Sequence, residues 1–270
     1  MIQQHAVYLE SMIDSSIVQS ISVIFSINLL GFIFAYLFKT DKLTDLLYGL
    51  SFVTAAIFIL SKGGITSAKL VLVIMISLWG IRLAAYLLIR ILKTGKDRRF
   101  DTIRADFLKF GGFWLLQAVT VTVIIWPSLV FLTKKPIFGT ANILGILVWS
   151  IGLLIEAIAD YQKFVFKLEN KTKWISSGLW KYSRHPNYFG EILCWWGIFM
   201  FAFPALKSWE YVGIISPIFI TYMLLFVSGI PILEKRYEKK YGSNPEYIKY
   251  KQKTSLLIPF PPYRFDNKNK

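Results

Sequence analysis

Cysteine is nearly absent from this sequence, since Cys194 is the only one in 270 residues. A single thiol excludes an intrachain disulfide and leaves the redox compartment open. Histidine is also scarce. His5 and His185 stand far apart in the sequence and cannot by themselves form a familiar zinc or haem site, so we expect no bound metal.

The short motifs of soluble cofactor-binding and hydrolytic enzymes are absent as well. The sequence contains no GxGxxG or GxxxxGKS/T loop for phosphates, no HExxH for zinc, no GxSxG nucleophile and no CxxC pair. It has no internal repeat and no low-complexity segment. Any chemistry must therefore be carried by side chains on another kind of framework.

Acidic residues are few, and 16 Asp and Glu against 31 Lys and Arg give a net charge of +15. Such a balance could indicate nucleic-acid binding. However, hydrophobic residues make up 55% of the chain and gather in long runs, and a helix needs about 20 apolar residues to cross a bilayer. The candidate spans are Ile17–Phe38, Leu46–Leu60, Leu70–Leu92, Phe113–Leu132, Ile143–Phe166, Tyr188–Phe203 and Tyr211–Leu233.

We therefore predict an all-α membrane protein, a seven-transmembrane-helix bundle that forms one domain over residues 1–270. Its cytoplasmic C-terminal tail is expected to be amphipathic, and frayed over residues 261–270. Residues 1–16 contain no Lys or Arg, so the first span is expected to be a retained helix and not a cleaved signal peptide.

The distribution of basic residues predicts the orientation. With the N-terminus outside, the inner segments hold 23 Lys and Arg and the outer segments hold 5. Loop Lys and Arg favour the cytoplasmic side, so the C-terminus is predicted to be cytoplasmic. The basic excess then reflects topology and attraction to anionic lipid head groups, without a nucleic-acid partner.

Ionisable residues within apolar helices are costly and mark candidate sites. On the third span Trp79, Arg82, Tyr86 and Arg90 share one face. Arg82 is expected to face a polar cavity, whereas Arg90 either does the same or extends to the membrane surface. The basic loop "KTGKDRRFD" that follows contains Arg98 and Arg99, which serve either topology or phosphate binding.

A second polar stripe lies on the fifth span. Glu156, Asp160, Lys163 and Lys167 follow one another at spacings of 4, 3 and 4 residues, so they share a face. The stripe could be a self-contained set of salt bridges. Such pairs contribute only about 0.2–0.5 kcal/mol in isolated helices, which does not offset burial in lipid, so a ligand role is the alternative.

The stretch "KYSRHPNYFGEILCWW" places a third polar group at the entrance of the sixth span. Pro186 is suited to the first position of a helix, and Asn187 and Glu191 lie one turn apart on one face. Glu191 is either a structural partner of Arg184 or another basic group, or part of the wall of a ligand pocket. After the last span, Glu234 and Tyr237 share a face, and Leu256–Phe260 is expected to lie at the interface or to act as a lid.

The segments "GLWKYSRHPNYFGEILCWWGIF" and "EKRYEKKYGSNPEYIKYKQKTSLLIPFPP" resemble the steroid 5-alpha-reductase C-terminal-like family of bacterial multi-pass membrane proteins. The resemblance extends from Leu43 to Pro262 in layout and is most specific in Gly178–Glu191. The superfamily also includes sterol reductases and isoprenylcysteine carboxyl methyltransferases. Arg-His-Pro is typical of the methyltransferases and Asn-Tyr-Phe-Gly-Glu of the reductases. Location in a bacterial inner membrane follows from the resemblance.

The resemblance also implies site residues. Those that match, or fall near, the reductases' substrate and NADPH contacts are Tyr86, Arg98, Arg99, Glu156, Asp160, Lys167, Asn187, Tyr188 and Glu191. The reductases carry an adjacent Gln-Glu pair on the second helix that polarises the substrate ketone. The second span here reads "TDLLYGLSFVTAAIFIL" and lacks it, which puts a 3-oxo-steroid substrate in doubt.

We therefore expect a membrane-embedded, NADPH-dependent reductase that transfers hydride to a polarised C=C bond of a lipophilic, steroid- or enone-like substrate entering from the bilayer. Tyr86, the expected proton donor, and Glu191 are the expected catalytic residues. The cofactor is expected to contact Arg98, Arg99, Glu156, Asp160, Lys167, Arg184, Asn187, Tyr188, Glu234 and Tyr237. Two alternatives stay open: an S-adenosylmethionine-dependent methyltransferase of a lipid-like or prenylated substrate, and a lipid-binding membrane protein without chemistry.

Overall fold

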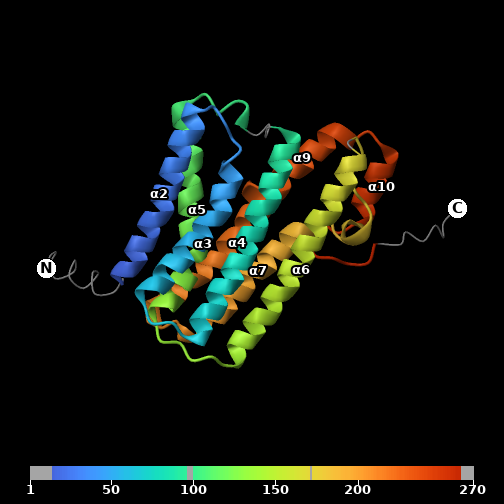
Figure 1. Ribbon diagram of the computed structural model, residues 1–270. Helices are drawn as coiled ribbons and strands as arrows, with labels where there is room; N and C mark the ends of the chain where they lie inside the picture. Colours follow the sequence, from blue (N-terminus) through green and yellow to red (C-terminus); the bar gives the residue numbers. More distant parts are fainter. Residues whose placement is uncertain (1–13, 96–99, 171, 263–270) are drawn as a thin grey trace. The chain divides into compact units, whose positions relative to one another are not determined.

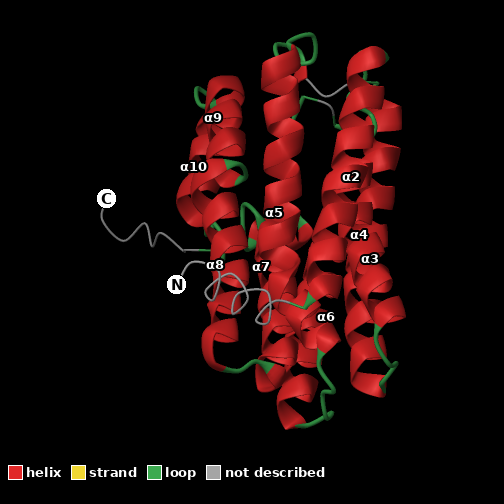
Figure 2. Cartoon of the chain, turned by 90° about the vertical axis from the view of Figure 1, so that its left-hand side faces the viewer, coloured by secondary structure: helices red, strands yellow, loops and turns green. Residues whose placement is uncertain are grey.

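The computed structural model describes residues 14–95, 100–170 and 172–262, and all regular elements within these ranges are helical (Figures 1 and 2). The longer helices are α2 (Ser15–Leu37), α3 (Thr44–Lys62), α4 (Ser67–Thr94), α5 (Phe107–Thr133), α6 (Thr140–Glu169), α7 (Pro186–Ala202), α8 (Ile215–Tyr222), α9 (Ile230–Tyr241) and α10 (Pro245–Lys253). Short 3-10 turns cover Gly178–Lys181, Phe203–Ala205 and Ser208–Ile214, and a π-helical turn covers Met223–Val227. The predicted all-α fold is confirmed.

Among the described residues, 7 helical segments are long and apolar enough to cross a membrane, as predicted. The chain is thus a multi-pass membrane protein. Two helices extend beyond the predicted spans. The second runs over 19 residues from Thr44 to Lys62, and the last continuous helical stretch covers Ser208–Tyr241. Glu234 and Tyr237 lie in α9, the polar C-terminal part of that stretch.

The described chain forms two compact units. The described residues of the first are 14–95, 100–146 and 198–216. In it, α3 packs against α2, α4 and α5. Polar groups in its interior satisfy one another: the Gln117 amide donates to Asn28 Oδ1 at 2.9 Å, and the Asn28 amide donates to Ser51 Oγ at 3.2 Å. Arg90 makes an ion pair with Asp45 at 3.0 Å, so its charge is balanced by α3 of this unit.

The second unit comprises residues 147–197 and 217–270. Here α6 and α7 approach so closely that glycine is required on both. A Cβ on Gly152 would lie 2.6 Å from the Gly190 carbonyl oxygen, and one on Gly190 would lie 2.6 Å from the Glu156 backbone nitrogen. Small residues permit such backbone contact between membrane helices. The polar stripe of α6 is thereby brought against the first two turns of α7.

The chain after α10 is held along the segment that leads into α7. Ser183 and Ser255 form an isolated parallel bridge, and the Ser183 hydroxyl donates to the Leu257 carbonyl at 2.6 Å. The Phe260 amide donates to the Tyr182 carbonyl at 3.2 Å. The segment predicted to be an interfacial anchor or lid is thus fixed by backbone pairing.

The close helix crossing predicts a large effect of one added methyl group. Gly190→Ala places a Cβ against backbone atoms of α6, and overpacking of this kind costs about 1–3 kcal/mol. Gly112→Ala on α5 is the matched control, because a Cβ there meets nothing within 4 Å. That change should leave stability unchanged or raise it by up to about 1 kcal/mol through helix propensity. Thermal unfolding in detergent measures both, and equal effects would contradict the crossing.

Candidate functional site

The two carboxylates of the α6 stripe face α7. Glu156 and Asp160 are buried, with 2% and 5% exposure. The Asn187 side-chain amide donates to Asp160 Oδ1 at 3.2 Å. Cys194 Sγ lies 3.9 Å from Glu156 Oε2, a weak hydrogen bond. The stripe therefore contacts α7. The spacing of its residues predicted that they share one face, but not which helix this face contacts.

Glu234 connects α9 to the entrance of α7. Its Oε2 forms an ion pair with the Arg184 guanidinium, and its Oε1 lies 2.9 Å from His185 Nε2. Arg184, one of the partners considered above for Glu191, pairs with Glu234. Glu191 lies on the second turn of α7, partly buried, and has contacts of its own.

His185 is one of the residues of this site that the sequence reasoning missed, together with most of the pocket residues described below. Its side chain is fully buried and lies parallel to the Tyr188 ring, with centroids 5.7 Å apart and planes 7° apart. Burial lowers its pKa, so the imidazole is neutral at pH 7. With Glu234 accepting from Nε2–H, the other nitrogen, Nδ1, carries a lone pair. The sequence Arg-His-Pro was interpreted above only as typical of the methyltransferases.

Four buried side-chain atoms, which belong to Trp174, Arg184, His185 and Asn187, have no hydrogen-bond partner among the described residues. These four residues are called the polar cluster below. His185 Nδ1 and Asn187 Oδ1 can accept, whereas Arg184 Nε and Trp174 Nε1 can donate. Buried polar groups are usually satisfied, and each exception needs an explanation such as a ligand. The cluster is thus equipped for a polar molecule that both donates and accepts hydrogen bonds.

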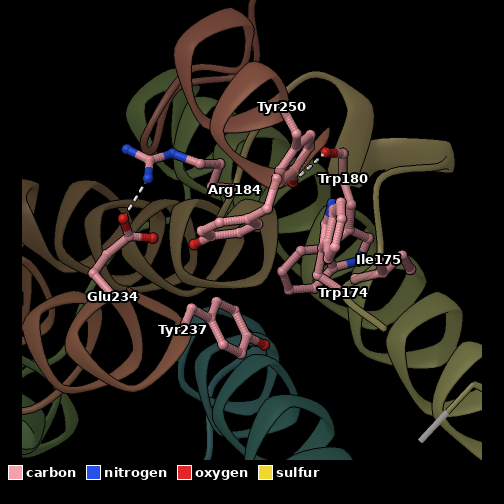
Figure 3. A pocket seen from close by; sticks show the side chains of 8 residues that line it. Trp174, Ile175, Trp180, Arg184, Glu234, Tyr237 and Tyr250 are labelled. Carbon is pink, nitrogen blue, oxygen red and sulfur yellow. Dashed lines mark hydrogen bonds and ion pairs between the residues drawn. The ribbon is translucent and has the colours of Figure 1, made fainter. Parts of the chain in front are cut away.

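An aromatic pocket adjoins this cluster (Figure 3). Its cavity volume is about 10 Å³, room for about one water molecule. Its lining consists of Trp174, Ile175, Trp180, Arg184, Glu234, Tyr237, Tyr247 and Tyr250. The Tyr250 hydroxyl donates to the Trp180 carbonyl at 2.7 Å. Lys163 Nζ lies 4.6 Å from the centre of the Trp180 ring, within the range of a cation–π contact.

The tyrosines of α10 are neutral at physiological pH. Burial raises the pKa of Tyr247 to about 12, and burial also raises that of Tyr250. Both hydroxyls therefore act as uncharged hydrogen-bonding groups. The pocket combines flat apolar walls with cationic side chains and one carboxylate.

A glycine turn fixes the Trp180 wall of the pocket to α6. Gly178 has a φ of +60°, and a Cβ there would lie 2.4 Å from Gln162 Oε1. The same oxygen accepts from the Leu179 amide at 2.9 Å, and Trp180 Nε1 donates to the Ala159 carbonyl at 3.0 Å. Only glycine fits this conformation and contact without strain.

The other predicted site residues lie as follows. Tyr237 lines the pocket, and the Lys167 ammonium donates to the Lys173 carbonyl. Tyr86 lies on α4, in the first unit. Arg98 and Arg99 fall outside the described residues. The second unit thus brings together Glu156, Asp160, Arg184, Asn187, Tyr188, Glu234 and Tyr237.

The burial of His185 predicts a pH effect on stability. Burial holds its pKa in the folded chain below the ordinary imidazole value of about 6.5. Below that pH the unfolded chain binds a proton that the folded chain does not. The contribution of His185 to the free energy of unfolding is therefore fully present above about pH 6.5. It falls as pH decreases, by at most about 1.4 kcal/mol per pH unit. Thermal unfolding between pH 8 and 5 should show a larger loss for the wild type than for His185→Gln, which keeps a donor to Glu234; equal losses would contradict this origin.

Comparison with known proteins identifies the family. The model of the family described as "Protein of unknown function (DUF1295)" matches residues 31–254. The "3-oxo-5-alpha-steroid 4-dehydrogenase 1" of Bos taurus is 30% identical over 118 residues, which is 43% of this chain and 40% of that protein. The match thus spans less than half the length of this curated relative. No solved structure matches the chain. The chain belongs to the DUF1295 family and is similar, over part of its length, to a steroid 5-alpha-reductase.

Proposed function

We propose that this protein is a membrane-embedded, NADPH-dependent reductase that transfers hydride to a polarised C=C bond of a lipophilic, steroid- or enone-like substrate. The observation that carries the proposal is the buried cluster of unpartnered donors and acceptors at the entrance of α7, next to the aromatic pocket. The partial likeness to a 3-oxo-5-alpha-steroid 4-dehydrogenase supports the reaction class.

The residues of the second unit fit a nucleotide cofactor. The cavity volume of about 10 Å³ leaves room for about one water molecule, so the proposal rests on the chemistry of the side chains that line the pocket and not on its size. Tyr237 lines the pocket and is partly exposed, so it offers a flat surface for a ring of the cofactor, since stacking on aromatic side chains accepts any base. Lys163 and Arg184 supply positive charge beside it. The proposal assigns cofactor phosphates to Arg184 and Lys167, together with Arg98 and Arg99.

The remaining roles follow from the chemistry of the side chains. NADPH supplies the hydride, and the protein supplies binding, orientation and a dry environment. Asn187 is held by Asp160, so its amide has one fixed orientation. Glu191, one turn further along α7, is proposed to complete the contact with the carboxamide. Tyr86 is proposed as the proton donor that stabilises the developing enolate oxygen.

The proposal names a class of substrate. It does not extend to a 3-oxo steroid in particular. The Gln-Glu pair that would polarise such a ketone is absent from α3, which instead contributes Asp45 to an ion pair with Arg90. The Arg-His-Pro sequence before α7 supports a second candidate, methyl transfer from S-adenosylmethionine to a lipid-like substrate. Both candidates need a site for a ligand that contains adenosine, so the identity of the ligand discriminates between them.

Ligand-dependent stability of the full chain in detergent tests the proposal. NADPH should raise the thermal unfolding midpoint, because a ligand at a hundredfold its Kd stabilises by about 2.7 kcal/mol. Addition of a 3-oxo-4-ene steroid or a simpler enone should then cause NADPH oxidation, followed by absorbance. A response to S-adenosylmethionine alone would assign the methyltransferase. If neither NADPH nor S-adenosylmethionine raises the unfolding midpoint, both proposed enzymatic functions are contradicted.

Two substitutions at Glu191 test its assigned role. Glu191→Gln keeps shape and hydrogen-bonding ability, so NADPH binding should fall only modestly. Glu191→Leu should abolish turnover while the protein still inserts, since α7 becomes more apolar. Loss of expression in Glu191→Leu, with unchanged NADPH affinity in Glu191→Gln, would make Glu191 a structural residue. Nucleotide affinity, turnover and yield from membranes are the measurements.

A further inference from the structure

The chain that follows α10 exposes large apolar side chains although it belongs to no membrane-spanning helix. Leu256, Ile258 and Phe260 are 40%, 47% and 57% exposed. Exposed apolar side chains that gather in one place commonly mark an interaction site on a protein or a membrane. Residues 255–260 are called the strap below, and their three exposed apolar side chains need a partner.

The strap is held in place by backbone hydrogen bonds. The Arg184 amide donates to the Ser255 carbonyl at 2.8 Å, and the Phe260 amide donates to the Tyr182 carbonyl at 3.2 Å. In Figure 1 the strap is part of the red chain that turns back from α10. Its first and last residues are thus bonded to the segment directly before α7, and the exposed side chains stay at that position.

The start of α7 lies at one edge of the bilayer. The membrane-spanning segment that begins there, Pro186–Ala205, has 20 residues, and a helix needs about 20 residues to cross the hydrocarbon. Asn187 is bonded to Asp160 of α6, and about 20 residues likewise separate Asp160 from Thr140, where α6 begins. Both helices thus put the same edge of the bilayer at the Asn187–Asp160 contact. The strap, bonded just before α7, therefore lies at the level of the lipid head groups.

The surroundings of the strap are basic. Lys181 is exposed next to the segment that binds the strap, and Lys249 and Lys253 lie on the last turns of α10. The sequence has no Asp or Glu in residues 247–260 or 178–190. Lysines beside a membrane attract anionic head groups. The exposed Tyr182 also fits this level, since tyrosine is enriched at membrane–water interfaces.

We propose that the strap docks on the bilayer leaflet at the start of α7. Its three exposed apolar side chains enter the interfacial layer, and the three lysines named above bind anionic head groups. A bilayer matches both features, because it offers acyl chains directly beside negative charge. Tyr247 and Tyr250 of α10, which precedes the strap, line the aromatic pocket. Docking therefore places this pocket at the membrane surface, where water-soluble and lipophilic molecules meet.

Fluorescence of the full chain in lipid nanodiscs tests the docking. Ile258→Cys carries the environment-sensitive label NBD, and Glu246→Cys, exposed at the opposite end of α10, is the matched control. Cys194 is the only native thiol and is buried, so the unaltered chain serves as the blank. Lipids with a nitroxide near the head group should quench the Ile258 label severalfold more than the Glu246 label. Aqueous iodide should quench them in the reverse order.

The charge of the lipid tests the role of the lysines. Lipid quenching of the Ile258 label should be stronger in nanodiscs that contain phosphatidylglycerol than in phosphatidylcholine alone, because anionic head groups attract the lysines. The combined substitutions Lys181→Gln, Lys249→Gln and Lys253→Gln should remove this difference. Lys135→Gln, at an exposed position of the first unit, should leave it unchanged.

Three results would contradict the inference. If iodide quenches the Ile258 and Glu246 labels equally, the strap faces water and the docking is overturned. If the Ile258 label is shielded from iodide but lipid does not quench it, a protein covers the strap and the docking is overturned as well. Equal lipid quenching with and without phosphatidylglycerol would overturn the assignment of the lysines. No nucleotide enters these measurements, so their outcome is independent of the proposed function.

Discussion

The second unit depends on one partly buried carboxylate. Glu234 binds Arg184 through one oxygen and His185 through the other, and so ties α9 to the start of α7. A charge in this environment is tolerated only when it is paired and hydrogen-bonded, and removal of one partner of such a pair is strongly destabilising. The pairing fixes the orientation of the imidazole through Nε2 and leaves Nδ1 as a hydrogen-bond acceptor. It also places the Glu234 carboxylate at the aromatic pocket.

The close contact of α6 and α7 provides the other half of the arrangement. Gly152 and Gly190 let the two backbones meet, and this contact brings Asp160 within reach of Asn187. Polar side chains that would be costly in lipid therefore face one another inside the protein. The α6 stripe and the entrance of α7 are parts of one cluster, although 27 residues separate Asp160 from Asn187 in the chain.

The cluster is polar but nearly closed to water, and this combination is what a hydride-transfer site requires. Neutral tyrosines, a neutral histidine and paired carboxylates can orient a ligand without free charge. The proposed reductase uses these features for NADPH, and a methyltransferase would use the same ones for S-adenosylmethionine. The chemistry of the bound ligand, and not the scaffold, separates the two.

The sequence by itself determined the seven spans, the shared face of Glu156 and Asp160, and the polar start of α7, because helical periodicity and apolar run length are local properties. Only the tertiary structure decided which groups meet. The contact between His185 and Glu234 joins residues 49 apart, and the pocket walls Trp174 and Trp180 come from a loop with no periodic pattern. Such pairings depend on where helices cross, and Gly152 and Gly190 showed their meaning only once their backbones were seen in contact.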